Sequence, residues 1–113
     1  MIIRKVDDVP VMETAHNVDA RNIYNTENAM VTVIRLKPGQ SLKKHITPVD
    51  VAFFVLQGEG VVEVGEERAV AGKDSLVESP KDISHCWYNE SSEDLVFMVI
   101  KAPRPAKKTV FVS

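Results

Sequence analysis

Residues 51–64 read VAFFVLQGEGVVEV, which is an apolar run, a turn and a second apolar run. Val51, Phe53 and Val55 fall on one side of an extended chain, because successive side chains of a strand point to opposite faces. Val and Phe favour strands, and the glycines of GEG favour a turn. The stretch therefore predicts two consecutive β-strands.

The same pattern recurs on both sides of this stretch. Short runs rich in Val, Ile, Phe and Thr alternate with clusters of Gly, Pro, Asp and Asn, and the dominant period of two residues is typical of strands. Asn, Asp and Thr crowd residues 14–28 and favour a loop there. Many short antiparallel strands in one domain predict an all-β barrel, because closure removes exposed sheet edges. We expect strands at 30–36, 41–46, 51–57, 61–64, 67–71, 75–79, 84–88, 95–101 and 109–112.

Length and charge narrow the class of protein. The 113 residues fit one domain spanning 1–113, and the formal net charge of -2 offers no basic excess for a nucleic-acid partner. The longest apolar runs are far shorter than the ~20 residues of a membrane helix, so we expect no membrane association. The first residues soon turn acidic at Asp7 and Asp8, unlike a signal peptide, which favours a cytoplasmic location. Cys86 is the single cysteine, so an internal disulfide is excluded.

Two histidines occur at spacings that resemble the two sequence motifs of the cupin superfamily. Residues 39–60 read GQSLKKHITPVDVAFFVLQGEG and contain His45, and residues 80–89 read PKDISHCWYN and contain His85. The family motifs read G-x5-H-x-H-x3–4-E-x6-G and G-x5-P-x-G-x2-H-x3-N. The resemblance covers about residues 30–102. It implies a double-stranded β-helix, or jelly-roll, barrel with one site in its mouth.

The resemblance also implies a metal, with an incomplete set of ligands. Family members usually hold iron, manganese, nickel or zinc with three histidines and one glutamate. His45 matches the first ligand and His85 the last. Thr47 stands at the second histidine position and Val51 at the glutamate position, so two of the four usual ligands are absent. Asp82 stands where the second motif has a glycine.

Asp50 and Glu78 are candidates to replace the absent ligands. Asp50 lies one position before the absent glutamate, so either Pro48 shifts the strand phase and turns it inward, or it is an ordinary turn residue. Glu78 lies in an apolar strand and points either into the site or to solvent. With both inward, His45, Asp50, Glu78 and His85 predict a two-histidine, two-carboxylate metal site.

Three further residues are predicted to contact a small-molecule ligand. Trp87 shares strand parity with His85, so it is either part of the core or one wall of a ligand pocket. Phe53 is expected to face it from another strand, and Thr47 adds a hydroxyl to the same pocket. His16 is interpreted as a satisfied surface or core residue.

Three functions are consistent with this site. The first is a small cupin barrel that binds a divalent metal and a small polar metabolite in its mouth, as a dioxygenase, isomerase or decarboxylase would. The second is a metal-free module that binds a small, sugar-like molecule without catalysis. The third is a structural or regulatory partner of another protein. The sequence selects no substrate and no reaction, because one fold carries many functions.

The strand at 51–57 also bears on assembly. Both of its faces are apolar, so the outer face of the barrel needs a cover. The N-terminal residues 1–20 or a second subunit would provide one. We expect a homodimer.

Overall fold

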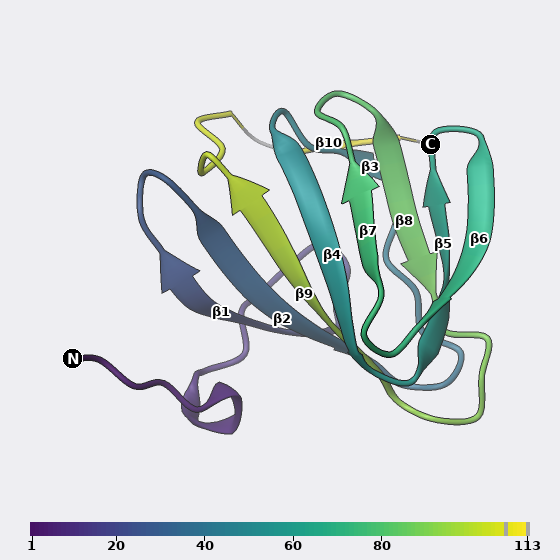
Figure 1. The fold of residues 1–113 in the computed structure, drawn as a ribbon, viewed down its shortest axis with the longest axis horizontal. Coiled ribbons are helices and arrows are strands. Elements are labelled where there is room, and N and C mark those ends of the chain that lie inside the picture. The colour runs from purple at the N-terminus through teal and green to yellow at the C-terminus, as the bar shows by residue number, and fades with distance from the viewer. Residues whose placement is uncertain (108, 113) are drawn as a thin grey trace.

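The computed structural model describes residues 1–107 and 109–112 and consists mainly of strands (Figure 1). A single 3-10 turn, Val6–Asp8, precedes the first strand, and no helix in the described ranges is long and apolar enough to cross a bilayer. The strands are β1 (Asp19–Asn25), β2 (Met30–Leu36), β3 (His45–Ile46), β4 (Asp50–Gln57), β5 (Glu59–Val64), β6 (Glu67–Gly72), β7 (Leu76–Ser79), β8 (Ser84–Tyr88), β9 (Leu95–Ala102) and β10 (Val110–Phe111).

Ten strands form two five-stranded sheets in the described part of the chain. The first sheet has the order β1-β2-β9-β4-β7 and the second has the order β10-β3-β8-β5-β6. Only the connections β1–β2 and β5–β6 join two strands of the same sheet. Each of the remaining connections passes from one sheet to the other. Neighbouring strands are antiparallel. The two sheets face each other across the core (Figure 1). The all-β, double-stranded β-helix prediction is confirmed.

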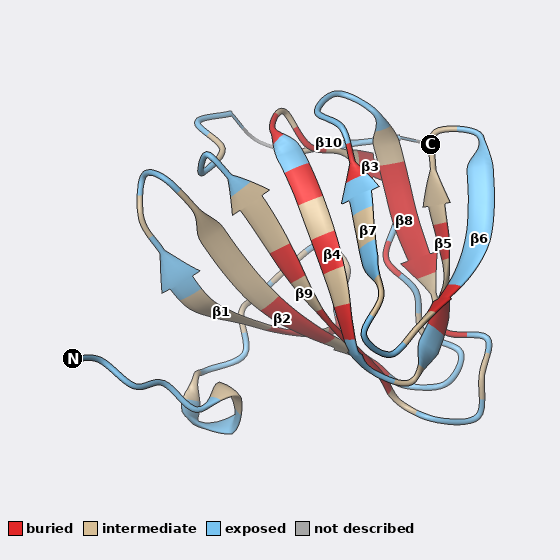
Figure 2. Cartoon of the chain, viewed as in Figure 1, coloured by how far each residue is buried: buried red, intermediate tan, exposed pale blue. Residues whose placement is uncertain are grey.

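Strand β4 shows how the sequence pattern builds this barrel. Val51, Phe53 and Val55 are buried in the core, whereas Ala52 and Phe54 are only half-buried on the other face. Figure 2 shows the resulting alternation of buried and intermediate positions along the strand. The alternation of every second residue in the sequence thus corresponds to an inner and an outer face of the strand.

The prediction of a loop over residues 14–28 is wrong for β1. Asp19–Asn25 pairs antiparallel with β2, and Ala20 is buried opposite Ile34. The side-chain amide of Asn22 donates to the carbonyl of Val31 on β2. The polar residues prefer loops only locally, and here pairing with a neighbouring strand outweighs that preference.

Asp82, which stands where the family motif has a glycine, has a backbone conformation that glycine favours. Asp82 has φ 65°, in the left-handed region that glycine adopts at no cost. Asp74, in the turn before β7, has φ 69°. Aspartate is among the few residue types that enter this region readily. Both turns therefore have a left-handed residue that is not a glycine.

The outer face of the first sheet is covered only in part. A hollow of about 320 Å³ separates the turn at Val6–Asp8 from Val33, Leu56 and Val96, so the N-terminal segment lies over one end of the sheet. The guanidinium of Arg21 on β1 fastens that segment by donating to three of its carbonyl groups. Farther along the sheet, apolar side chains stay half-exposed on the outside.

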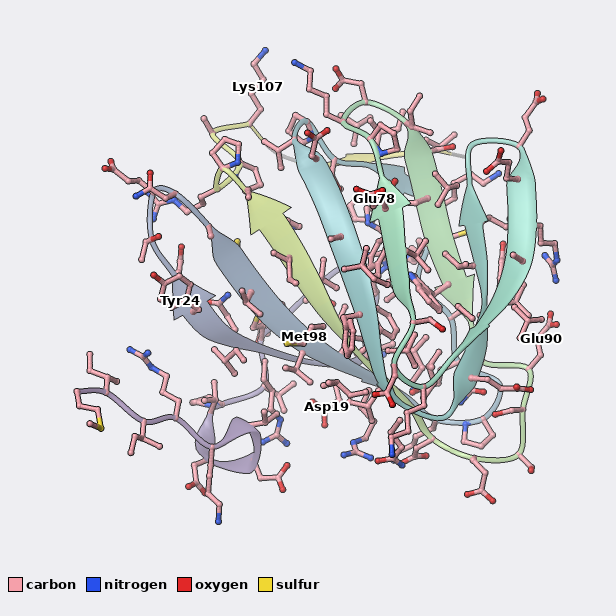
Figure 3. The ribbon with its side chains drawn as sticks, in the orientation of Figure 1. Asp19, Tyr24, Glu78, Glu90, Met98 and Lys107 are labelled. Carbon is pink, nitrogen blue, oxygen red and sulfur yellow. The ribbon has the colours of Figure 1, made fainter. Side chains whose placement is uncertain are left out.

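The homodimer remains a prediction, and this partly uncovered face is where we expect it. Phe54, Met98 and Ile100 are half-buried on the outer face, and Met98 projects from β9 in Figure 3. A stable interface there would bury more than about 2,000 Å² in total. Met98→Lys is expected to dissociate the dimer in sedimentation at tens of micromolar. Val70→Lys, at an exposed apolar position on the second sheet, is the control and should not. A monomeric wild type would contradict the prediction.

Candidate functional site

The barrel brings the two family histidines into direct contact. Strands β3 and β8 are neighbours, and His45 is the register partner of His85. Their Nε2 atoms lie 3.1 Å apart, with the rings edge to face and 4.5 Å between centroids. Both side chains are buried. The predicted meeting of His45 and His85 in one site therefore occurs.

Hydrogen bonds determine where the protons of this pair lie. Nδ1 of His45 is 2.6 Å from the carbonyl oxygen of Lys43, and a carbonyl only accepts, so His45 carries its proton on Nδ1. Its Nε2 is then an acceptor, and His85 donates to it from its own Nε2. Nδ1 of His85 accepts from the Ser79 hydroxyl at 2.7 Å. The two neutral imidazoles thus satisfy each other in one chain of hydrogen bonds.

Burial holds these imidazoles neutral. Desolvation, with smaller contributions from the charges of His45 and Lys101, lowers the pKa of His85 to about 3. Desolvation also lowers the pKa of His45, although the hydrogen bond to Lys43 works against it. An imidazolium inside the barrel would lose its hydration without gaining a carboxylate partner. At neutral pH both rings are therefore uncharged donors and acceptors.

A third imidazole and a phenyl ring come from the two ends of the chain. The His16 ring lies 4.9 Å from that of His45 and 5.4 Å from that of Phe111, between centroids. Its Nδ1 accepts a hydrogen bond from the backbone N–H of Lys43, so its proton is on Nε2. Desolvation, followed by the charge of His45, lowers the pKa of His16 to about 4. The interpretation of His16 as an ordinary surface or core residue missed this position, which no spacing motif marks.

A lysine completes the group. Lys101 has the strand parity of Leu95, Phe97 and Val99 on β9, whose side chains are in the core, so Lys101 points into the barrel at its mouth. Burial lowers the pKa of its amine. None of the ion pairs found among the described residues involves Lys101. Sequence reasoning missed this residue too, although its parity on the strand at 95–101 was a usable signal.

These groups surround a small cavity of about 110 Å³. His16, His45 and Lys101 are the lining residues with nitrogen in their side chains, and Phe53 is part of the apolar lining. Among the described residues, no aspartate or glutamate lines it. A larger hollow of about 640 Å³ is lined by residues of the 11–19 segment together with Arg35, Lys37 and Gln40, and no histidine is among its described lining residues. The cavity is therefore a basic, partly apolar pocket at the barrel mouth.

The two carboxylates proposed as ligands are not in this cavity. Asp50 and Glu78 are exposed and line a groove on the outer face of the first sheet. Glu78 pairs with Ala52, which shares its parity with Asp50, so all three point outward. Figure 3 shows Glu78 on β7 on this outer side. Pro48 does not shift the phase of β4, and the Asp50 carboxylate instead accepts from the backbone N–H of Lys81.

The three residues expected to contact a ligand have different positions. Phe53 lines the cavity. Thr47 is buried, and its hydroxyl lies 3.3 Å from Nε2 of His85, behind the cavity wall. Trp87 is fully buried and stacks on Phe97 with 4.7 Å between ring centroids, so it belongs to the core. Of the two interpretations of Trp87, the structure therefore supports core packing and not the wall of a pocket.

Comparison with known proteins decides the family. The cupin domain family matches residues 32–101, which is more than half of the chain. The chain belongs to the cupin domain family. This cupin is also similar to the uncharacterized protein MJ0764 of Methanocaldococcus jannaschii, with 28% identity over 86 residues that cover 75% of this chain and 74% of that protein.

Solved structures agree with the assignment. The crystal structure of TT1209 from Thermus thermophilus has a TM-score of 0.80 and 28% identity, covering 93% of this cupin and 100% of that chain. The polyketide cyclase RemF from Streptomyces resistomycificus has a TM-score of 0.86 at 14% identity, covering 100% of this chain and 86% of that one. At such low identity the likeness to RemF shows the fold alone.

The residues at the mouth of this cupin do not fit the divalent metal of its family. Only His45 and His85 offer nitrogen ligands at the family positions, and their Nε2 atoms already share a hydrogen bond. Among the described residues no group of three or more His, Cys, Asp or Glu could hold a metal ion. Protein metal sites of this kind have three protein ligands or more. Lys101 adds a cation to the same cavity, which would repel a second one.

Proposed function

We propose that this cupin binds a small organic acid in the cavity at its mouth, without a metal. The observation that carries the proposal is that Lys101 lines the cavity beside His16 and His45, with no acidic residue among the described residues of the wall. This is the metal-free binding module among the functions considered from the sequence, with an acid in place of a sugar-like ligand. No reaction is part of the proposal.

Charge is the first argument for an acid. An ammonium group inside a barrel loses hydration, and that loss is costly unless an anion compensates it. No ion pair among the described residues supplies such an anion to Lys101. A ligand carboxylate in the cavity would supply it, since a charge-assisted hydrogen bond is roughly twice as strong as a neutral one.

Hydrogen-bond direction is the second argument. The His16 ring makes one described hydrogen bond, which its Nδ1 accepts from the backbone of Lys43. Its Nε2–H therefore has no acceptor among the described hydrogen bonds. Nδ1–H of His45 is already used by the carbonyl of Lys43. The cavity therefore offers the donor of His16 together with the ammonium of Lys101. A carboxylate has two oxygen atoms that only accept, so it matches both.

Size and polarity limit the rest of the ligand. Liquid water takes about 30 Å³ per molecule, so 110 Å³ holds only about four water molecules or a comparably small organic molecule. Phe53, Ile34 and Val99 make part of the wall apolar. A short aliphatic acid fits this space better than a sugar ring, which would need more room and more polar partners.

The test compares a small acid with its neutral isostere. Propionate is expected to raise the Tm of the wild type, and propionamide is not. At a hundredfold excess over Kd, binding to the folded state alone contributes about 2.7 kcal/mol. Lys101→Met is expected to abolish the rise. Lys107→Met, at the exposed lysine that projects from the barrel in Figure 3, should retain it.

Two outcomes would contradict the proposal. One is an equal response of the wild type and Lys101→Met to propionate. The other is a rise in Tm with manganese, iron(II), nickel or zinc that His45→Ala removes, because the metal hypothesis would then be restored. The metal series is run on the same protein at pH 7.5, where the imidazoles are neutral and protons do not compete.

A further inference from the structure

The amine of Lys101 can take part in a reaction as well as bind an acid. It is a primary amine that lines a cavity of about 110 Å³ together with His16 and His45. Its neighbours in the two adjacent strands are Met30 and Val51, neither of which carries a charge. An amine in such a place can be a nucleophile as well as a cation.

The surroundings make the uncharged form of this amine more populated than it is for a lysine on the surface. A lysine on the surface is almost entirely protonated at neutral pH, and a protonated amine has no lone pair with which to attack. Burial lowers the pKa of Lys101, and the imidazoles of His16, His45 and His85 feel its charge. No carboxylate of the described residues lines the cavity to hold the proton on the amine. The fraction of free amine is therefore larger than on the surface.

We propose that the ε-amino group of Lys101 forms a reversible imine with the carbonyl carbon of a small oxo acid in this cavity. The proposal rests on the acid binding proposed above and adds a covalent step to it. The oxo acid class follows from the contents of the cavity, where one nitrogen is a nucleophile and the His16 N–H is left to bind the carboxylate.

The step balances without any further reactant. The lone pair of Nζ attacks the carbonyl carbon, the C–N bond forms and the carbonyl π bond breaks. The two protons of the amine leave with the former carbonyl oxygen as water, and the C=N bond of the imine remains. No oxidant or reductant is needed, and water reverses the reaction. Phe53, Ile34 and Val99 form the apolar part of the wall beside the amine.

Trapping by reduction tests the proposal on the whole protein. Wild-type protein is incubated with pyruvate and sodium cyanoborohydride, which converts an imine to a stable secondary amine. One adduct per chain is expected by intact-mass spectrometry, and peptide mapping should place it on Lys101. An excess of propionate, which occupies the same cavity and has no reactive carbonyl, should suppress the adduct.

Two matched variants separate this proposal from the acid binding. Lys101→Arg retains the positive charge but cannot form an imine, so it should lose the adduct and retain a propionate-induced rise in Tm. Lys107→Arg should form the adduct on Lys101 as the wild type does. The melting curve of each variant without ligand shows whether it is folded.

Each outcome has a definite meaning. No adduct on wild-type Lys101, or an adduct spread equally over surface lysines and unaffected by propionate, would overturn the imine. If pyruvate raises the Tm of the wild type in those cases, acid binding stands and only the covalent step fails. If neither acid raises the Tm, the binding proposal fails, whatever the labelling shows.

Discussion

Acidification from pH 7 to pH 4.5 is expected to lower the free energy of unfolding by about 3 kcal/mol through His85 alone. In the unfolded chain this imidazole takes up a proton below its ordinary pKa of about 6.5. In the folded barrel, burial lowers its pKa to about 3, so the folded state stays unprotonated over most of that range. The unfolded state therefore binds more protons, and stability falls as the pH drops from 6.5 toward 3.

His16 and His45 also lower the free energy of unfolding as the pH falls. Burial lowers the pKa of His16 to about 4 and lowers that of His45, so each also favours the unfolded chain when protons are abundant. The measurement is urea unfolding at several pH values between 7 and 4.5. Wild type and His85→Gln are compared by the slope of stability against pH rather than by stability itself, because glutamine does not titrate.

The slope of His85→Gln is expected to be smaller than that of the wild type by about 1.4 kcal/mol per pH unit. The rest of the sequence is the same in both proteins, so its contribution to the slope cancels in this comparison. Equal slopes would mean that His85 is protonated as easily in the folded barrel as in the unfolded chain. The burial of His85 in the folded barrel would then be wrong.

The second large effect concerns the glycines of the VLQGEG stretch. Gly58 has φ 78°, and a Cβ built there would collide with the backbone carbonyl oxygen of Asp94. A Cβ at Gly60 would lie 2.9 Å from Cε3 of Trp87, in the packed core. Neither the backbone of Asp94 nor the buried indole can move aside freely. These positions therefore need glycine for space, and Gly58 needs it for its backbone angle as well.

Gly58→Ala is expected to cost about 3 kcal/mol, and Gly60→Ala about 1–3 kcal/mol, from overpacking and, at Gly58, from the left-handed backbone. Gly72→Ala is the matched control. A Cβ at Gly72 meets no described atom closer than Cβ of Glu59 at 3.9 Å, which is ordinary contact. Urea midpoints for the three variants measure the effect. A stability of Gly60→Ala equal to that of Gly72→Ala would contradict the tight packing against Trp87.

The family motif predicted the positions of the two histidines but not those of the two carboxylates. His45 and His85 were predicted at the right place because β3 and β8 pair in this fold. The prediction that Asp50 and Glu78 replace the two absent ligands depended on whether each side chain points into or out of the barrel. That face follows from the register of β4 with β7, in which Glu78 lies opposite Ala52. A phase shift at Pro48 was compatible with the sequence and does not occur.

The sequence by itself determined the all-β class, the positions of most strands and the pair of histidines. These features are local or nearly so, since period-two alternation, turn residues and motif spacing can all be read along the chain. The strand β1 was missed for the same reason, because its polar residues favour a loop until β2 is beside them.

The tertiary structure alone decided what the site contains. His16 comes from the N-terminal segment, Phe111 from β10 and Lys101 from the end of β9, and they meet only because the barrel closes at its mouth. Contacts between residues so far apart in sequence leave no periodic signal. The charge of the cavity depends on those contacts, because they bring Lys101, His16 and His45 into one wall that has no acidic side chain among its described residues.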